Sequence, residues 1–300
     1  MTARLAPLAL AALLLGGCGG GGDEPAEIAF VSSRDGVYSI YVMSADGKGE
    51  RRLTEGEAPT GESPSGLFYE VEPAWSPDGT RVAFASRRRG NFDIYVMRAD
   101  GAGTIRLTSA AADESSPSWS PDGKRIVYQR GNPSELWVME ADGSVARKLA
   151  RLDASEHDPA WSPDGDWIAY QLRRLGTPLA EIHLVRPDGT GGRRLTTVRG
   201  QSASPAWSPD GGQVAFAAKP TGGRDYDIHT VRIDGARLRR ITDSPVDEFE
   251  PAFSPDGSEI AFDRGGAIAV VRPGDEVREL TDPDDNDGSP AWRRAPVSPK

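Results

Sequence analysis

The sequence has one cysteine, three histidines and no apolar run long enough to span a membrane. A lone cysteine excludes an internal disulfide, so stability has to come from packing. No HExxH, CxxC, GxSxG or phosphate-binding glycine loop occurs, which leaves no motif for a metalloprotease, a hydrolase or a nucleotide-binding enzyme. The formal net charge of −10 disfavours nucleic acid and anionic lipid surfaces as partners. We therefore expect no enzyme activity, no cofactor and no metal site.

What the sequence does contain is a repeated phrase, PAWSPDG or a close variant. It occurs at 73–79, 117–123, 159–165, 205–211 and 251–257, with a truncated PAW at 290–292. Successive SPDG turns start 44, 42, 46 and 46 residues apart. This spacing is the length of one four-stranded sheet with its loops, which indicates an array of such sheets.

Each repeat predicts four strands and two tight turns. Pro-Asp-Gly presets the first turn, and a β-rich run such as Val82-Ala83-Phe84 follows it. A third run such as Ile94-Tyr95-Val96-Met97 ends in an Asp-Gly hairpin signal, and a fourth strand ends on Leu-Thr or a variant. The tryptophan or phenylalanine of the phrase is expected to be core, and so are His183 and His229, which take the place of aromatics in the third strands.

The two ends of the array are complementary. Ile28-Ala29-Phe30 starts the array without a preceding phrase, and Trp292 ends it without a following strand. We therefore predict an all-β, six-bladed β-propeller in which a C-terminal strand around residues 290–292 closes the first blade. The propeller is expected to span residues 27–294, followed by a tail at 295–300.

The WSPDG, IAF, DIYVM and ADG elements resemble the TolB-type, WD40-like propeller repeat over residues 27–294. The resemblance implies the fold. It leaves function open, because such repeats also occur in the propeller of prolyl-oligopeptidase-type enzymes and in some polysaccharide lyases. The chain departs from TolB itself in having only about ten residues, and no α/β domain, between its N-terminal segment and its first strand.

The N-terminus resembles a lipoprotein signal. Arg4 precedes an apolar core from Leu5 to Leu15, and Leu15-Gly16-Gly17-Cys18 resembles a lipobox. The apolar core is about half the roughly 20 residues that span a bilayer. We predict a signal peptide at 1–17, lipid attachment on Cys18 and a flexible tether at 18–26, with a plain secretory signal as the alternative. The mature protein is then exported and anchored outside the cytoplasmic membrane or within the periplasm.

Acidic residues gather in the loops that lead into the expected innermost strands. Three residues before the repeat proline stand Glu70, Glu114, Glu156 and Glu248, and one residue before it stand Glu72, Asp158 and Glu250, alternating with Ser116, Ser204 and Ser289. Arginine-rich loops share this face, so we expect an acidic axial mouth circled by arginines. A basic partner segment suits the mouth better than Ca²⁺, which needs six to eight oxygens; a merely solvated rim is the alternative.

Two further features are candidate sites. Phe68 and Tyr69 lie in the longest connection between repeats and are predicted to contact a partner, unless they fold back on their own blade. His157 stands in the acidic mouth and is a candidate to join the carboxylates as a metal ligand or base, although the three scattered histidines have no metal-ligand spacing.

The sequence as a whole predicts a non-enzymatic, monomeric, lipid-anchored propeller. We expect it to act as a scaffold for protein–protein interaction at the bacterial cell envelope, and to bind an envelope protein through a basic segment or loop. The alternative is a carbohydrate-binding or carbohydrate-cleaving, polysaccharide lyase-like propeller that uses the arginines for acidic glycans.

Overall fold

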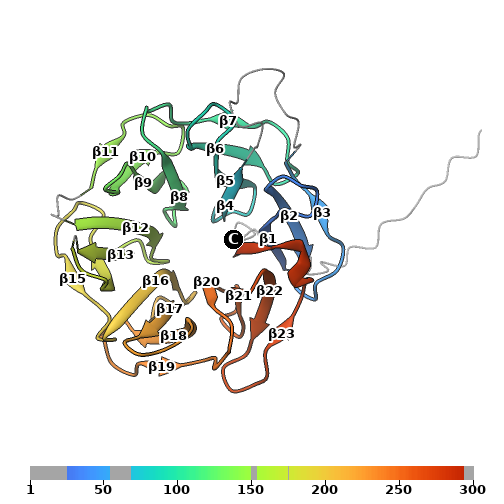
Figure 1. Ribbon diagram of the computed structural model, residues 1–300. Coiled ribbons are helices and arrows are strands. Elements are labelled where there is room, and N and C mark those ends of the chain that lie inside the picture. The colour runs from blue at the N-terminus through green and yellow to red at the C-terminus, as the bar shows by residue number, and fades with distance from the viewer. Residues whose placement is uncertain (1–25, 55–68, 150–153, 175, 294–300) are drawn as a thin grey trace, which may run out of the picture.

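The computed structural model describes residues 26–54, 69–149, 154–174 and 176–293. In this part of the chain the strands are arranged radially around a central axis, as Figure 1 shows, so the fold is an all-β propeller. The predicted signal peptide, most of the tether and the tail lie outside the described residues. No helix among the described residues is long and apolar enough to cross a bilayer.

Four sheets have four strands each. In hydrogen-bonding order they are β24 (Gly288–Trp292), β1 (Glu27–Ser32), β2 (Ser39–Ser44) and β3 (Arg51–Arg52); β4 (Glu70–Trp75), β5 (Arg81–Ser86), β6 (Asp93–Arg98) and β7 (Ile105–Arg106); β8 (Glu114–Trp119), β9 (Arg125–Arg130), β10 (Glu135–Glu140) and β11 (Arg147–Lys148); and β20 (Glu248–Phe253), β21 (Ile260–Arg264), β22 (Ala267–Val271) and β23 (Arg278–Glu279). A 3-10 helix, η1 (Pro283–Asp285), precedes β24.

The remaining strands form one sheet of eight. They are β12 (Ala154–Trp161), β13 (Ile168–Arg174), β14 (Ala180–Val185), β15 (Arg193–Arg194), β16 (Gly200–Trp207), β17 (Gln213–Pro220), β18 (Asp227–Arg232) and β19 (Arg239–Arg240). The prediction of a six-bladed propeller is therefore confirmed in its fold, but only four of the six expected blades form sheets of their own. The other two are joined by a parallel bridge between Ala180 of β14 and Gln201 of β16.

The C-terminal strand completes the sheet that the N-terminal residues begin. β24 pairs antiparallel with β1, with Trp292 opposite Ile28 and Ala291 opposite Ala29. Arg293 adds to this contact, because its N–H donates to the carbonyl of Glu27 and its guanidinium pairs with the Glu27 carboxylate at 2.6 Å. The ends of the described chain are thereby held together by main-chain hydrogen bonds and an ion pair.

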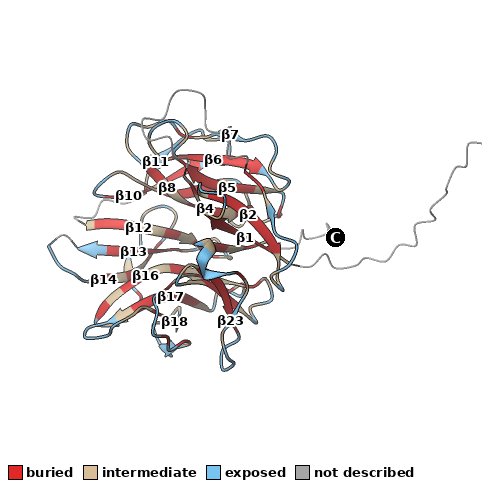
Figure 2. Cartoon of the chain, turned by 45° about the vertical axis from the view of Figure 1, so that its right-hand side comes forward, coloured by how far each residue is buried: buried red, intermediate tan, exposed pale blue. Residues whose placement is uncertain are grey.

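Buried side chains fill the space between successive sheets. Figure 2 shows burial along the strands and exposure at the loops. The inner tryptophans Trp75, Trp119, Trp161, Trp207 and Trp292 are buried, whereas Phe253 is partly exposed. His183 and His229 pack against Tyr170 and Phe216 with ring centroids 5.9 and 5.8 Å apart, which confirms that these two histidines replace packing aromatics.

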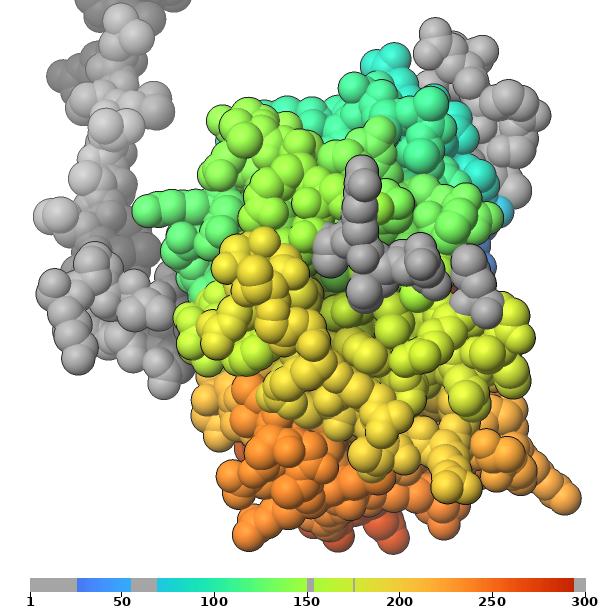
Figure 3. All heavy atoms as spheres, turned by 90° about the vertical axis from the view of Figure 1, so that its left-hand side faces the viewer, coloured from blue at the N-terminus to red at the C-terminus, as the bar shows by residue number. Residues whose placement is uncertain are grey.

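The Asp-Gly turns bring neighbouring repeats close together. A Cβ at Gly101, Gly143 or Gly189 would lie 2.3, 2.7 or 2.2 Å from the carbonyl oxygen of the Leu-Thr or Leu-Ala strand end in the preceding repeat. Each of these glycines also has a positive φ of 86–88°. Glycine is therefore required here by contact between repeats as well as by the turn. The result is the sequential packing of repeats visible from one side in Figure 3.

Candidate functional site

The residue before each repeat proline adopts an unusual backbone conformation. We call these six residues the axial ring: Glu72, Ser116, Asp158, Ser204, Glu250 and Ser289. Their φ angles are 49–56°, a left-handed conformation that non-glycine residues adopt at some energetic cost. The register of the innermost strand shifts at the same place in each repeat, so each ring residue sits in a β-bulge. The bulge interrupts the regular alternation of side chains along the strand at the axial-ring residue.

The carboxylates of the axial ring contact the serines of the next repeat. The backbone N–H of Ser116 donates to Glu72 Oε2 at 2.5 Å, and that of Ser289 donates to Glu250 Oε2 at 2.7 Å. The hydroxyls of Ser204 and Ser289 lie 3.4 and 2.9 Å from carboxylate oxygens of Asp158 and Glu250. Acid and serine therefore alternate as linked pairs.

These side chains surround one cavity on the axis. The axial ring and the six repeat prolines line a volume of about 150 Å³, and the three carboxylates are partly buried. The structure thus brings Glu72, Asp158 and Glu250 together, as the repeat positions imply. Among the described residues no lysine or arginine forms an ion pair with any of them.

Burial and mutual repulsion alter the acidity of the ring. Burial raises the pKa of Glu72 from 4.5 to about 7, and that of Glu250 from 4.5 to about 7, with Coulombic repulsion between the carboxylates adding to both. Burial also raises the pKa of Asp158. An incoming cation would lower these pKa values again, so the ring can release protons when it binds positive charge.

The other predicted mouth residues lie elsewhere. Glu70, Glu114, Glu156 and Glu248 are at most 3% exposed, so their predicted place on the acidic mouth is wrong. Strict alternation puts the third and first residues before the proline on the same face, but the bulge at the axial ring separates them. Glu70, Glu114 and Glu248 instead lie buried, where they pair with Arg88 in the loop after β5, Arg130 at the end of β9 and Arg264 at the end of β21.

These contacts also account for part of the expected arginine circle. Asp287 and Arg34 form the same kind of pair in the first sheet at 2.9 Å. Glu156 departs from this pattern and accepts the backbone N–H of Leu136 at 2.9 Å. Each carboxylate–arginine pair joins the beginning of the innermost strand to the end of the second strand or to the loop just after it. These arginines therefore support buried carboxylates, and they are engaged in ion pairs.

His157 does not join the axial carboxylates in a metal site. Its Nε2 lies 2.8 Å from the hydroxyl of Ser155 in the same strand, and burial lowers its pKa. No group of three or more possible ligands that could hold a metal ion is found in the described parts of the chain. The site residues therefore offer hydrogen bonds and negative charge.

Tyr69 lies against its own propeller. Its ring stacks on Tyr38 with centroids 5.1 Å apart and planes at 24°, and the two residues form a parallel β-bridge. This contact agrees with the alternative interpretation, in which Tyr69 folds back on the propeller. Phe68, the second predicted contact residue, lies outside the described residues, as does the predicted lipid-bearing Cys18.

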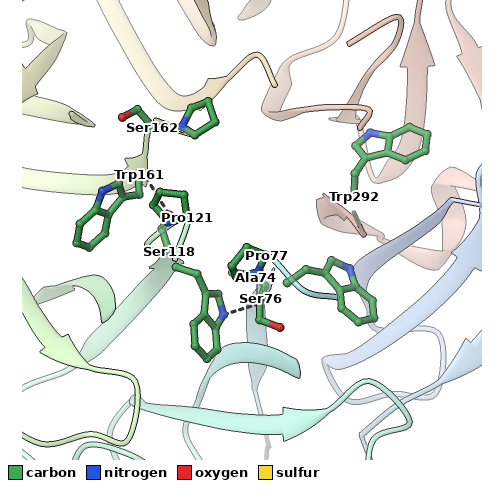
Figure 4. A pocket seen from close by; sticks show the side chains of 11 residues that line it. Ala74, Ser76, Pro77, Ser118, Pro121, Trp161, Ser162 and Trp292 are labelled. Atoms are coloured by element: carbon green, nitrogen blue, oxygen red, sulfur yellow. Dashed lines mark hydrogen bonds between the residues drawn. The ribbon is translucent and has the colours of Figure 1, made fainter. Parts of the chain in front are cut away.

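Sequence reasoning missed a second axial cavity, of about 150 Å³, on the tryptophan side of the repeat phrase. Of the tryptophans that line it, Trp75, Trp119 and Trp292 donate their indole N–H to an alanine carbonyl of the preceding repeat, but Trp161 donates to Gly165 of its own turn. Ser118 accepts the backbone N–H of Trp161 instead, at 3.0 Å. Figure 4 shows the rings of Trp161 and Trp292 turned away from the centre of the cavity. The signal was the change from PAW to PSW at residues 117–119, in the repeat that precedes Trp161.

Comparisons with known proteins agree with this architecture. The model of the TolB beta propeller domain matches residues 65–185 and again residues 182–293. An uncharacterized protein of Agrobacterium fabrum is 37% identical over 78 residues, which are 26% of this chain and 23% of that protein. A Tol-Pal system protein TolB of Desulfosudis oleivorans is 33% identical over 79 residues, which are 26% of this chain and 16% of that protein. The matched segments thus span less than a quarter of these relatives.

Among solved structures, TolB from Acinetobacter baumannii superposes with a TM-score of 0.74 at 22% sequence identity. The match covers 89% of this chain and 66% of that one. At this identity the likeness shows a common fold. The two matches of the family model together cover most of the chain, which confirms the resemblance seen in its repeats: the protein belongs to the TolB β-propeller family.

Proposed function

We propose that this protein is a non-enzymatic scaffold for protein–protein interaction at the bacterial cell envelope. The observation that carries the proposal is the axial ring. Its three carboxylates converge on one cavity and are joined by serine and backbone donors, with no pairing lysine or arginine among the described residues. A ring of uncompensated negative charge around a concavity attracts positive charge.

A basic segment or loop of an envelope protein is the partner that this ring suits best. Lysine and arginine side chains are long enough to enter an axial cavity and to reach more than one carboxylate. The raised pKa values of Glu72 and Glu250 mean that part of the ring is protonated near neutrality, so binding is coupled to proton release. A relative named as a Tol-Pal system protein supports a role in an envelope complex.

The architectural part of the proposal is that six repeats act as six blades. The eight-stranded sheet then functions as two blades, β12–β15 and β16–β19, linked at Ala180 and Gln201. The propeller spans residues 27–294 as one monomeric domain. This arrangement places one axial-ring residue from each repeat around the cavity. The ring forms a shaped binding face, and binding requires no catalytic group.

We further propose that residues 1–17 direct export, that lipid on Cys18 anchors the protein, that residues 18–26 form its tether and that 295–300 is a tail. Support comes from the sequence alone, through the short apolar core and the single cysteine at its end. The protein would then lie on the outside of the cytoplasmic membrane or within the periplasm.

The decisive experiment compares two triple variants. Glu72→Gln, Asp158→Asn and Glu250→Gln together remove three charges from the axial ring. Glu140→Gln, Glu276→Gln and Asp284→Asn remove three charges from exposed side chains for which no hydrogen bond is seen. A partner is first captured from envelope extracts by the unaltered protein and identified, and its association rate with each variant is then measured at low and moderate salt.

We expect the axial variant to associate about ten-fold more slowly at low salt and to lose most of its salt dependence. The control variant should retain the salt dependence of the unaltered protein within a factor of about two. Equal rates for both variants would show that the ring does not bind the partner. Turnover of a substrate by the unaltered protein would overturn the non-enzymatic part.

A further inference from the structure

A second charged site lies away from the axis, in the groove between the repeat of β8–β11 and the repeat of β12–β15. It is a cavity of about 260 Å³ at the turn ends of these strands. Three arginines line it, Arg125, Arg147 and Arg186, together with the carboxylates of Asp166 and Asp188. Neither the family match nor the axial ring accounts for this cluster.

The arginines are held in place by contacts that leave their charge unpaired. Arg125 lies over the ring of Trp161 and Arg186 over that of Trp167, each 4.8 Å from the ring centroid. Arg147 donates through Nη2 to the carbonyl of Pro187 at 2.7 Å. Within the described residues, none of the three forms an ion pair. Because a guanidinium has five N–H donors, each keeps donors for a ligand.

Comparison with the other repeats shows that this groove is unusual. The arginines that correspond to Arg186 are all paired: Arg98 with Asp100 at 3.0 Å, Arg232 with Asp234 at 3.4 Å, and Arg272 with Glu259 at 3.1 Å. Arg186 also has an aspartate two residues later, but Trp167 holds it instead.

Each of the other two arginines is matched in only one of the two neighbouring grooves. Arg81 lies over Trp119 in the preceding groove as Arg125 lies over Trp161, and Arg193 donates to the carbonyl of Ile233 in the following groove as Arg147 does to that of Pro187. In the preceding groove the counterpart of Arg147 is Ile105 and that of Arg186 is Glu140. In the following groove the counterpart of Arg125 is Trp167 itself. Single arginine contacts of these kinds recur, but the convergence of all three unpaired arginines in one groove is a departure from the repeat pattern.

The charges in the cavity define its ligand. Three guanidinium groups and two aspartates leave a local charge of about +1, which suits a monoanion and disfavours a phosphate monoester, whose charge is about −1.5 to −2. Arginine binds carboxylates through two parallel N–H donors. Oδ1 of Asp188 accepts from the backbone and hydroxyl of Thr190 at 2.8 and 2.7 Å, and these bonds lower the pKa of the carboxyl. Asp188 is thus an ionised acceptor with its other oxygen available for hydroxyl groups.

We propose that this cavity binds a uronic acid unit of an acidic polysaccharide. The carboxylate of the sugar would lie against Arg147 and Arg186, and its hydroxyls would donate to Asp188 and Asp166. The volume of about 260 Å³ suits a single sugar ring, since pockets for drug-sized ligands run from about 300 to 1,000 Å³. The site is independent of the axial ring, so a scaffold that binds protein at the axis would also hold the envelope polysaccharide at its side.

The test compares two sugars that differ only in the carboxylate. The full chain in detergent micelles is titrated with glucuronic acid and with glucose, and binding is measured by calorimetry. We expect a dissociation constant on the order of 1 mM for glucuronic acid, as is reasonable for a single charged sugar, and no measurable binding of glucose. Arg186→Gln and Arg147→Gln should each weaken glucuronic acid binding about ten-fold.

Arg232→Gln is the matched control, because Arg232 occupies the same position in the next repeat and is paired to Asp234. It should change binding by less than about two-fold, and melting curves verify that all variants fold. Unchanged affinity in Arg186→Gln would overturn the site. Inorganic phosphate that binds as tightly as glucuronic acid would show a general anion site and overturn the sugar assignment. The axial triple variant should bind glucuronic acid normally, which separates this result from the fate of the proposed scaffold function.

Discussion

The substitution Glu72→Gln is expected to stabilise the protein above pH 7 and to change its stability much less near pH 5. The reason is the pKa of Glu72, which burial raises from 4.5 to about 7. A carboxyl whose pKa is higher in the folded than in the unfolded state stabilises the fold fully below the unfolded value. That stabilisation is lost as the pH rises through 4.5 to about 7.

The size of the effect follows from this interval. At about 1.4 kcal/mol for each unit of pKa, the rise in the pKa of Glu72 from 4.5 to about 7 corresponds to roughly 3 kcal/mol. Glu72 is partly exposed, and solvent screening reduces this figure, so we expect a gain of about 1–2 kcal/mol for Glu72→Gln at pH 8. The amide oxygen of glutamine can still accept the N–H of Ser116, which preserves the ring geometry.

Urea unfolding at pH 5 and pH 8 measures this directly. A gain of about 1 kcal/mol corresponds to a rise of about 2–4 °C in Tm for a domain of this order of size. Glu276→Gln, an exposed acid whose side chain forms no ion pair among the described residues, is the control and should behave alike at both pH values. If Glu72→Gln kept the full pH dependence of the unaltered protein, the burial of charge in the axial ring would not be what sets that dependence.

Three further predictions concern closure, anchoring and the contact of Tyr69. Deleting residues from Ser289 onward removes β24 and Trp292, a loss of several kcal/mol against a typical stability of about 5–15, so cooperative melting should disappear; a truncated protein that melts like the full chain would contradict closure by β24. Cys18→Ser should abolish incorporation of an alkynyl fatty acid, and label that persists on this variant would exclude Cys18 as the lipid site. Tyr69→Ala should lower the free energy of unfolding by about 1–2 kcal/mol through loss of the Tyr38 stack, measured as a drop in Tm. A Tm equal to that of the unaltered protein would instead favour Tyr69 as a residue that contacts a partner.

The sequence by itself determined the elements and their order. The turns of Pro-Asp-Gly and Asp-Gly, the alternating strands and the unmatched ends at Ile28 and Trp292 depend on local chemistry and counting, so they could be predicted. The same holds for His183 and His229, whose repeat positions are those of packing aromatics. The three carboxylates next to the repeat prolines could also be predicted to meet, because equivalent positions of a propeller repeat meet at the axis.

Tertiary structure decided what depends on contacts between repeats. The bulge at the axial ring breaks the alternation of the strand, so Glu70 is buried beside Arg88 while Glu72 lines the cavity, although both have the same parity in the sequence. The bridge from Ala180 to Gln201 merges two sheets. Arg186 lies over the ring of Trp167 and forms no ion pair with Asp188, the aspartate two residues later. None of these outcomes has a local signal, because each depends on a contact with a side chain or backbone group of a neighbouring strand or repeat.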